Sequence, residues 1–336
     1  MIDSTGPVWD AIVGLSRFAA LAAMAELNCA EHLASGPMSV SELAKACDAH
    51  EPSLTRVLRE LETVGVVRTV VPGMYELTEE GQTLRDGVPG SLRSAVRVTA
   101  ENGYWYAMGN LAQTVRDGQS AFITRFGPLY GYFQEHPEAA RLFNEYMAIR
   151  AAPLEAALAT AYDFTGVRTL VDVAGGTGHL LAAVLDRHPG MRGVLFDIAH
   201  VVEDARESMR ARGLGDRCEF ESGDFFGSVP AGGDLYLLAS VIHNWSDEAA
   251  LRILANVRKA LPGTGRMLLL EMVLPDDATP HIGKDLDMRM LALTDGGRER
   301  TLSEHTRLLG EAGFTLSRVL PLPAGASLIE ALPADR

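Results

Sequence analysis

The 336-residue sequence is poor in the features that mark secreted and membrane proteins. Its three cysteines, Cys29, Cys47 and Cys218, are odd in number and far apart along the chain, which predicts neither a disulfide framework nor a zinc knuckle. No run approaches 18 uninterrupted apolar residues, and no basic segment precedes an apolar one at the N-terminus. We therefore expect a cytoplasmic protein without a membrane span.

Basic side chains are also scarce. The formal net charge is −14, and the lysines are limited to Lys45, Lys259 and Lys284. Affinity for nucleic acid rests on clustered Lys and Arg, so no nucleic-acid partner is expected. Hydrophobic residues make up 47% of the chain, and its length predicts two domains that each bury a core.

Residues 1–100 are predicted to form a mostly helical domain. Apolar residues recur at three- and four-residue spacing from Pro7 to Leu33, and Ser39–Leu43 resembles a capped helix start before a second helix at 52–64. Two short apolar runs around a turn at Pro72-Gly73 then predict a hairpin, which completes a winged-helix arrangement. Because this region carries 13 acidic and eight basic residues, it favours a dimerisation role over DNA binding.

Residues 101–164 continue helical and are rich in aromatic side chains. Tyr104, Trp105 and Tyr106 are consecutive, and neighbours on a helix point about 100° apart, so these rings cannot all face one core. Core packing and a cavity for a flat ligand are equal alternatives for them. Trp105 is our candidate for such a cavity.

From residue 165 to 336, short apolar runs alternate with helical patterns. This alternation is typical of βαβ units and predicts an α/β domain with a parallel, doubly wound sheet. The last two apolar runs, 316–320 and 327–331, are separated by prolines and predict an antiparallel hairpin at the sheet edge. Ligands of such sheets bind beyond the carboxyl ends of the strands.

Three of these strand ends carry ligand-type residues. The first is the turn Asp172-Val173-Ala174-Gly175-Gly176-Thr177-Gly178, in which glycines let a ligand approach the backbone closely. Asp197, 21 residues after Gly176, suits the two hydroxyls of a ribose. Asp224 and Phe225 suit the amino group and the face of an adenine. An adenosine-containing ligand is predicted, with these candidate binding residues: Asp172, Ala174, Gly175, Gly176, Asp197, Asp224 and Phe225.

NAD is one alternative ligand, and a glycine turn without a ligand is another. The dinucleotide fingerprint needs a third glycine for close packing of the helix on the strand. The segment Gly176-Thr177-Gly178-His179-Leu180-Leu181 has leucine at that place, which disfavours NAD.

His243 is the candidate for proton transfer. It follows the fourth strand, and an imidazole titrates near neutrality, so it suits a general base for a phenol or an enol. Asn244 is placed to hold a neighbouring oxygen. A base also needs an acceptor for its other ring nitrogen. Glu271, expected at the end of the fifth strand, and Glu299, in a glycine-flanked loop, both qualify, although Glu299 fits an ordinary loop charge equally well.

These motifs resemble those of the S-adenosylmethionine-dependent small-molecule O-methyltransferases of the plant caffeate and bacterial polyketide-tailoring kind. Leu170–Gly178 is similar to the family's glycine motif, with Ala174 in place of a usual glycine, and His243-Asn244-Trp245 is similar to the segment whose histidine is the catalytic base. The resemblance runs over nearly the whole chain. It implies a class I methyltransferase Rossmann-like sheet and a homodimer, with a winged-helix dimerisation domain (1–100), a helical connector lining the substrate pocket (101–164) and a cofactor domain (165–336).

The resemblance also implies residue roles. Glu271 and Glu299 match the two glutamates that flank the base, and Asp197 and Asp224 match the ribose and adenine acids. The residues that would enclose a flat aromatic acceptor are Trp105, Phe143, Met147, Asn244 and Met290.

Two further positions depart from the family pattern. Ala239 stands where plant members carry a lysine against the adenine, so that contact is missing or replaced by Ser240. Arg289 replaces an apolar residue, and it either faces away or reads an acidic group of the acceptor.

The implied reaction is direct transfer of a methyl group from S-adenosylmethionine to an acceptor oxygen, in secondary metabolism. It needs no metal, because the sulfonium is already an activated electrophile, and the sequence also shows no convincing ligand cluster. The acceptor is predicted to be phenolic or of the polyketide type. The alternatives are an N- or C-methyltransferase, a non-methylating enzyme on the same scaffold, and a winged-helix regulator that senses a nucleotide.

Overall fold

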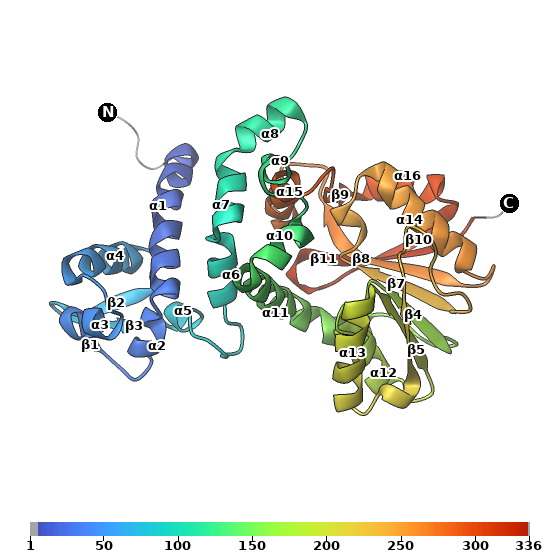
Figure 1. Cartoon of the computed structure of the whole chain (residues 1–336), viewed down its shortest axis with the longest axis horizontal. Coiled ribbons are helices and arrows are strands. Elements are labelled where there is room, and N and C mark those ends of the chain that lie inside the picture. The colour runs from blue at the N-terminus through green and yellow to red at the C-terminus, as the bar shows by residue number, and fades with distance from the viewer. Residues whose placement is uncertain (1–5, 335–336) are drawn as a thin grey trace. The chain divides into compact units, whose positions relative to one another are not determined.

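The structure is a computed structural model that describes residues 6–334. The chain divides into two compact units (Figure 1). The first unit comprises the N-terminal residues up to Tyr106 together with Tyr130–Ile149, and the second comprises Ala107–Leu129 together with the chain from Arg150 onward. The segment expected as a connector, 101–164, therefore contributes residues to both units.

The first unit begins with the expected winged-helix elements. The capping box is present, since Ser39 Oγ accepts from Glu42 N and the Glu42 carboxylate accepts from Ser39 N. Leu43, Leu58 and Leu61 are fully buried in the core of this unit. The sheet order is β1-β3-β2, and the elements are α1 (Pro7–Glu26), α2 (Cys29–Leu33), β1 (Met38–Ser39), α3 (Val40–Ala46), α4 (Glu51–Thr63), β2 (Val67–Val71) and β3 (Met74–Leu77).

Helix α1 presents much of its apolar surface to solvent in the single chain. Val8, Ile12 and Leu15 are 75%, 56% and 62% exposed, whereas Met24 near its end is buried. By length and composition alone α1 is apolar enough to cross a membrane, which differs from the expectation drawn from the lack of an uninterrupted apolar run. An exposed apolar stripe of this kind also marks a protein–protein interface.

The cysteines are free thiols. Cys29 and Cys47 are 18 residues apart in the sequence, but α2 and the end of α3 bring their sulfur atoms to 3.5 Å from each other. Burial raises the pKa of both thiols, so both are held in the protonated, unreactive form.

Seven further helices follow. Two of them, α8 and α9, pack on α15 within the second unit, where Ser120 Oγ donates to Ala292 O at 2.6 Å. The helices are α5 (Glu79–Gln82), α6 (Arg93–Thr99), α7 (Asn102–Gly109), α8 (Leu111–Asp117), α9 (Ala121–Phe126), α10 (Leu129–Glu135) and α11 (Pro137–Ala161).

The second unit is the expected doubly wound sheet, in the order β10-β11-β8-β7-β4-β5-β6. Strands β4 to β8 are parallel, and the predicted hairpin β10–β11 adds an antiparallel edge to β8. The strands are β4 (Thr169–Val173), β5 (Arg192–Asp197), β6 (Cys218–Ser222), β7 (Leu235–Ala239), β8 (Arg266–Leu274), β9 (Arg300–Thr301), β10 (Phe314–Pro321) and β11 (Ala326–Pro333). The helices are α12 (His179–Arg187), α13 (Ala199–Ala211), α14 (Asp247–Ala260), α15 (Ile282–Leu293) and α16 (Leu302–Glu311).

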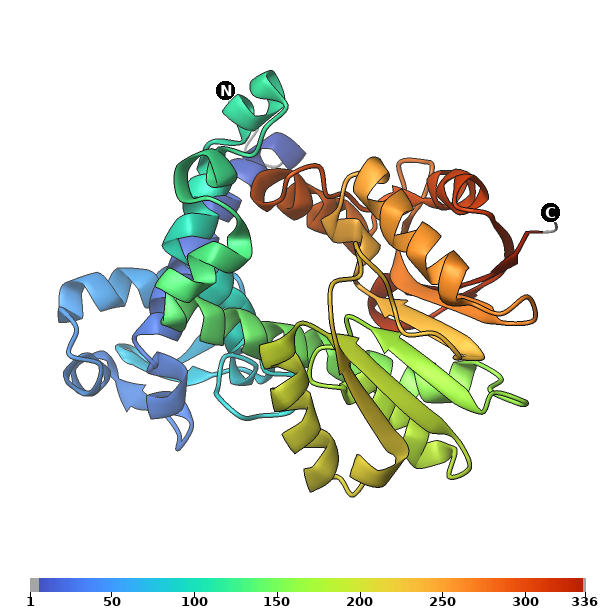
Figure 2. The same ribbon diagram turned by 45° about the vertical axis from the view of Figure 1, so that its right-hand side comes forward.

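Alternation along the strands builds a core on each face of this sheet. In β4, Leu170 packs with α12 and α13, while Val171 and Val173 pack with α14 and α16. Figures 1 and 2 show α12 and α13 on one face and α14 and α16 on the other. Because β4 and β7 are neighbours whose following strands run to opposite edges, the sheet has its topological switch point between them.

Candidate active site

His243 follows β7 at this switch point. It lies in a short 3₁₀ turn, Ile242–Asn244, and α14 begins three residues later, where Ser246 Oγ accepts from Ala249 N at 3.3 Å. This cap stops the turn from extending into the helix. The side chain of His243 is 10% exposed, so most of the ring is buried beside the switch point.

Two buried carboxylates contact the same ring nitrogen. Nδ1 of His243 lies 3.2 Å from Glu271 Oε2 and 3.2 Å from Glu299 Oε1. Glu271 is itself held in place, because its Oε1 accepts from Val241 N at 3.0 Å and from Ile242 N at 2.9 Å. The carboxylates require a hydrogen on Nδ1, which leaves Nε2 as the nitrogen that can accept a proton.

Glu271 lies inside its strand rather than at the end. We expected the fifth strand to stop there, but β8 continues to Leu274, three residues further. The extension is stabilised by β9, which pairs with Val273 and Leu274. Glu271 is therefore held in a regular strand of the sheet.

The carboxylates control the charge of the histidine. Burial opposes protonation of His243, but Glu271 and Glu299 outweigh it and raise the pKa of the ring to about 10. Burial also opposes ionisation of Glu271, yet His243 holds the pKa of that carboxyl below its ordinary value. His305, a second buried histidine, has no carboxylate within ion-pair distance among the described residues, and burial lowers its pKa.

Glu299 is positioned by a residue to which we gave no role from the sequence. Its backbone N–H donates to Asp287 Oδ1 on α15 at 2.9 Å. This bond joins the helix of Met290 to the loop that carries Glu299. The available signal was weak, because Asp287 lies on an amphipathic helix where a polar residue needs no explanation.

The structure brings the glycine turn and Asp197 together. Asp197 Oδ2 accepts from Gly176 N at 3.0 Å and Oδ1 accepts from Ile198 N at 2.7 Å, which leaves a lone pair on each oxygen for a ligand. Ala174, at the position of the usual glycine, adopts a φ of 58° in the left-handed region. A Cβ at Gly175 would lie 2.7 Å from Asp172 Oδ2, so a larger residue at this position would displace the Asp172 carboxylate.

Asp172 provides a direct test of the ligand. Its Oδ2 is buried without a hydrogen-bond partner among residues 6–334, and burial together with Asp197 raises its pKa to about 7. A cationic group nearby would compensate this charge. S-adenosylmethionine carries such groups, an ammonium and a sulfonium, so the residues present fit it.

The adenine-type residues lie at the end of β6. Asp224 is exposed, and its Oδ1 accepts from Phe226 N at 2.8 Å. Phe225 is half-buried, and its ring contacts Trp245 edge-on at 5.9 Å. Because Trp245 follows His243 by two residues, this contact links the predicted adenine end to the turn of the base.

The remaining candidates occupy varied surroundings. Ser240 has a φ of 54°, and its carbonyl accepts from Asn244 Nδ2 at 3.1 Å, so the Asn244 amide stabilises the turn. Met290 on α15 is half-buried, and Arg289 beside it pairs with Asp285 at 2.9 Å.

Three candidates lie in the first unit. Trp105 is 40% exposed and stacks on Phe18, with the ring centroids 5.6 Å apart. Phe143 packs on Phe133 with a centroid distance of 4.8 Å, and Met147 is half-buried.

His243, Glu271 and Glu299 are also residue types that bind metal ions, and they lie close together. Their ligand-type atoms lie within 4.8 Å of one another, a grouping seen nowhere else in the described part of the chain. A metal there would bind Nδ1 without its hydrogen. Metal coordination at Nδ1 and an Nδ1 hydrogen shared with the carboxylates therefore exclude each other.

Comparison with known proteins agrees with this arrangement. The sheet order and the ligand-type turns at its switch point place the chain in the methyltransferase fold class. An O-methyltransferase domain model matches residues 108–315, and an O-methyltransferase dimerisation domain model matches residues 9–86. The chain belongs to the O-methyltransferase family and is an S-adenosylmethionine-dependent enzyme.

Relatives of known structure or activity cover nearly all of the chain. It is 41% identical to a phenazine O-methyltransferase of Lysobacter antibioticus over 92% of this chain and 90% of the relative. A mitomycin 7-O-methyltransferase structure matches with a TM-score of 0.91 at 35% identity, covering 97% of each chain. A neocarzinostatin-biosynthesis O-methyltransferase, crystallised with S-adenosylmethionine and 2-hydroxy-5-methyl naphthoic acid, matches with a TM-score of 0.81 at 31% identity, covering 94% of this chain and 95% of that one.

Proposed function

We propose that this enzyme methylates a phenolic hydroxyl of a small aromatic secondary metabolite, with His243 as the general base and without a metal. The contact of His243 Nδ1 with two buried carboxylates carries the proposal. These carboxylates raise the pKa of the ring towards that of a phenol, and a smaller difference between the two pKa values favours proton transfer. The relatives named for a phenazine and crystallised with a hydroxynaphthoic acid support an aromatic acceptor.

The chain's residues divide the work. The glycine turn, Asp172, Asp197, Asp224 and Phe225 would hold the methyl donor, with Ser240 at the adenine side. Bound S-adenosylmethionine supplies an activated methyl group on a sulfonium. Nε2 of His243 takes the acceptor's proton, while Glu271 and Glu299 stabilise the imidazolium that forms. Much of the rate comes from holding the acceptor oxygen about 3–3.5 Å from the methyl carbon in line.

By the family resemblance, five residues would enclose the aromatic acceptor: Trp105, Phe143, Met147, Asn244 and Met290. Arg289 would read an acidic group only at the cost of its pairing with Asp285. We likewise propose that the chain has three functional segments: a dimerisation domain (1–100), a connector that lines the substrate pocket (101–164) and a cofactor domain (165–336).

We also propose a cytoplasmic homodimer. The dimerisation domain model covers most of α1, and the exposed side chains of Val8, Ile12 and Leu15 give this helix an apolar surface that a second copy would bury. Sedimentation at micromolar concentration should give the mass of two chains. The mass of one chain would contradict the proposal.

Activity should rise with pH, because His243 must be neutral to accept the proton of the phenol. The complex of protonated His243 with a neutral phenol must therefore lose one proton before methyl transfer. The pKa of His243 is raised in the ligand-free enzyme, so kcat/KM should increase up to about tenfold per pH unit below the midpoint of this limb. Glu299→Gln removes one of the two carboxylates, lowers the pKa of His243 and moves the acid limb to lower pH. Rate measurements from pH 6 to 10 on both proteins test this, and an acid limb that stays in place or moves to higher pH would contradict it.

The function itself is tested by titration calorimetry with S-adenosylmethionine, followed by a coupled assay for S-adenosylhomocysteine over a panel of phenols, anilines and aromatic acids. We expect binding, with product from phenols and undiminished turnover after treatment with EDTA. Product from amines alone would indicate N-methylation. Binding without product across the panel would favour a non-methylating enzyme, and loss of activity with EDTA would contradict the metal-free site.

A further inference from the structure

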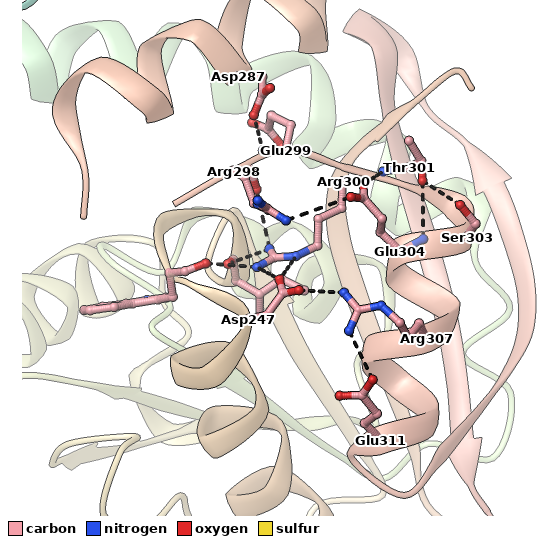
Figure 3. A network of polar contacts seen from close by, with 12 residues as sticks. Asp247, Asp287, Arg298, Glu299, Arg300, Thr301, Ser303, Glu304, Arg307 and Glu311 are labelled. Carbon is pink, nitrogen blue, oxygen red and sulfur yellow. Dashed lines mark hydrogen bonds and ion pairs between the residues drawn. The ribbon is translucent and has the colours of Figure 1, made fainter. Parts of the chain in front are cut away.

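Arg300 is a buried charge next to the proposed base machinery. Its side chain is 1% exposed, and its residue is among the largest that are fully buried in the described chain. Burying a guanidinium is costly unless its N–H groups are paired. Nε and one terminal nitrogen donate to Asp247 Oδ1 at 3.0 and 2.8 Å, and the terminal nitrogens also donate to Ile242 O at 3.0 Å and Trp245 O at 2.9 Å (Figure 3).

These acceptors lie on both sides of His243. Ile242 precedes it, Trp245 follows two residues later, and Asp247 begins α14. The carbonyl of His243 itself accepts from Arg298 N at 2.8 Å. The backbone that carries the base is therefore bonded along its length to the segment 298–300.

The same segment carries Glu299. Its carboxylate contacts the ring of His243, while Arg298 N donates to the carbonyl of His243 and Arg300 donates to the carbonyls of Ile242 and Trp245. Arg300 also belongs to β9, which pairs with β8 two residues beyond Glu271. The segment 298–300 thus fixes the distances between His243, Glu271 and Glu299, and these distances set the protonation of the ring.

Gly297 gives an independent sign of this close fit. A Cβ built there would clash with Thr294 Oγ1. It would also lie 2.8 Å from His243 O and 2.9 Å from the carbonyl carbon of Asn244. The last two are backbone atoms that cannot rotate away. A side chain at this position would push the turn of the base away from the loop of Glu299.

We infer that Arg300 is a positioning residue for methyl transfer, which fixes the His243 turn against the Glu299 segment so that Nδ1 stays within reach of both carboxylates. The inference rests on the proposed function, since it assigns Arg300 no chemistry apart from that of His243. Lysine cannot replace it, because an ammonium is a point charge that lacks the planar fork needed to reach two carbonyls and a carboxylate together.

A purely structural role predicts a different outcome. In that case a variant loses thermal stability, but its folded fraction turns over normally with an unaltered pH profile. A positioning role predicts a lower kcat and a shift of the acid limb to lower pH, because a longer Nδ1–carboxylate distance weakens the charge that stabilises the imidazolium.

The test uses the full-length enzyme with Arg300→Lys and Gly297→Ala. We expect kcat to fall about tenfold or more in each, since a misplacement of about 1 Å costs up to 10²-fold, with the dissociation constant of S-adenosylmethionine within twofold of wild type and the acid limb at lower pH. Gly297→Ala leaves every charge in place, so it decides the matter if Arg300→Lys does not fold.

Two matched variants serve as controls. Arg307→Ala removes the exposed arm of the same network, where Arg307 pairs with Asp247 Oδ2 at 2.6 Å, and Gly310→Ala adds a methyl group where nothing lies within 4 Å. Both should keep wild-type kcat and pH profile. Wild-type kcat and acid limb in Gly297→Ala and in folded Arg300→Lys would overturn the inference. Full activity of a His243 variant would instead refute the proposed function.

Discussion

Replacing His243 with alanine should lower kcat by about 10²–10⁴-fold, while the affinity for S-adenosylmethionine stays within a fewfold of wild type. General-base catalysis contributes rate enhancement of that size. The His243 ring contacts the two glutamates. It takes no part in the hydrogen bond between Gly176 N and Asp197 that holds the donor-binding turn. Production of S-adenosylhomocysteine and titration calorimetry measure the two quantities separately.

A second variant guards against an effect on folding. Without the ring, Glu271 and Glu299 face each other in a buried site, and one of them would have to take up a proton. His243→Gln keeps an N–H donor for a carboxylate but cannot accept the acceptor's proton, so it should be as inactive as the alanine variant. His305→Gln changes another buried histidine, which lacks these carboxylate contacts, and should retain activity within a fewfold. Turnover near wild type in His243→Gln would refute its role as the base.

Asp197→Ala should weaken binding of S-adenosylmethionine by about 10²–10⁴-fold. Hydrogen bonds to a charged group contribute about 1.5–3 kcal/mol each, and two ribose hydroxyls would be lost as donors. The variant also removes the acceptor for Gly176 N, so the glycine turn keeps only the backbone bonds that Ala174 N and Gly175 N donate to Phe196 O of β5. At saturating donor, kcat should recover most of its wild-type value, because His243 and its carboxylates are untouched.

Asp234→Asn is the matched control for this effect. Asp234 also accepts two backbone N–H groups, from Arg168 and Thr169 at 2.9 Å each, but it does so at the amino end of the same sheet. Its substitution should alter stability and leave donor affinity unchanged. A dissociation constant for Asp197→Ala equal to that of wild type would remove Asp197 from the ribose site.

Much of the second unit could be predicted from local pattern. Each parallel strand is a short apolar run whose alternate residues pack on opposite faces, and this periodicity is visible in the sequence itself. The ligand turn and Asp197 follow from the same reasoning, because carboxyl ends of parallel strands meet at one edge of a sheet. The capping box of Ser39 and Glu42 shows the same directness, since both of its bonds join residues three apart.

The site around His243 divides differently. A histidine after a strand end is a local feature, so its place at the switch point was predictable. Glu299 lies more than fifty residues further along the chain, and no local pattern separates a charge that contacts the ring from an ordinary loop charge. The fold resolves this ambiguity by pairing β9 with β8, and Glu299 and Glu271 each lie 3.2 Å from the same nitrogen.

Composition, periodicity and turn chemistry thus specified the winged helix, the doubly wound sheet, the adenosine-type turns and the candidate base, because each depends on neighbours within a few residues. Long-range contacts specified the rest. Arg300 is one of several arginines in a polar loop until folding buries it against the turn of the base, and Asp287 becomes significant only through the backbone of Glu299. The division of residues 101–164 between the two units has the same cause, since the partners of a helix are chosen by packing and not by its own sequence.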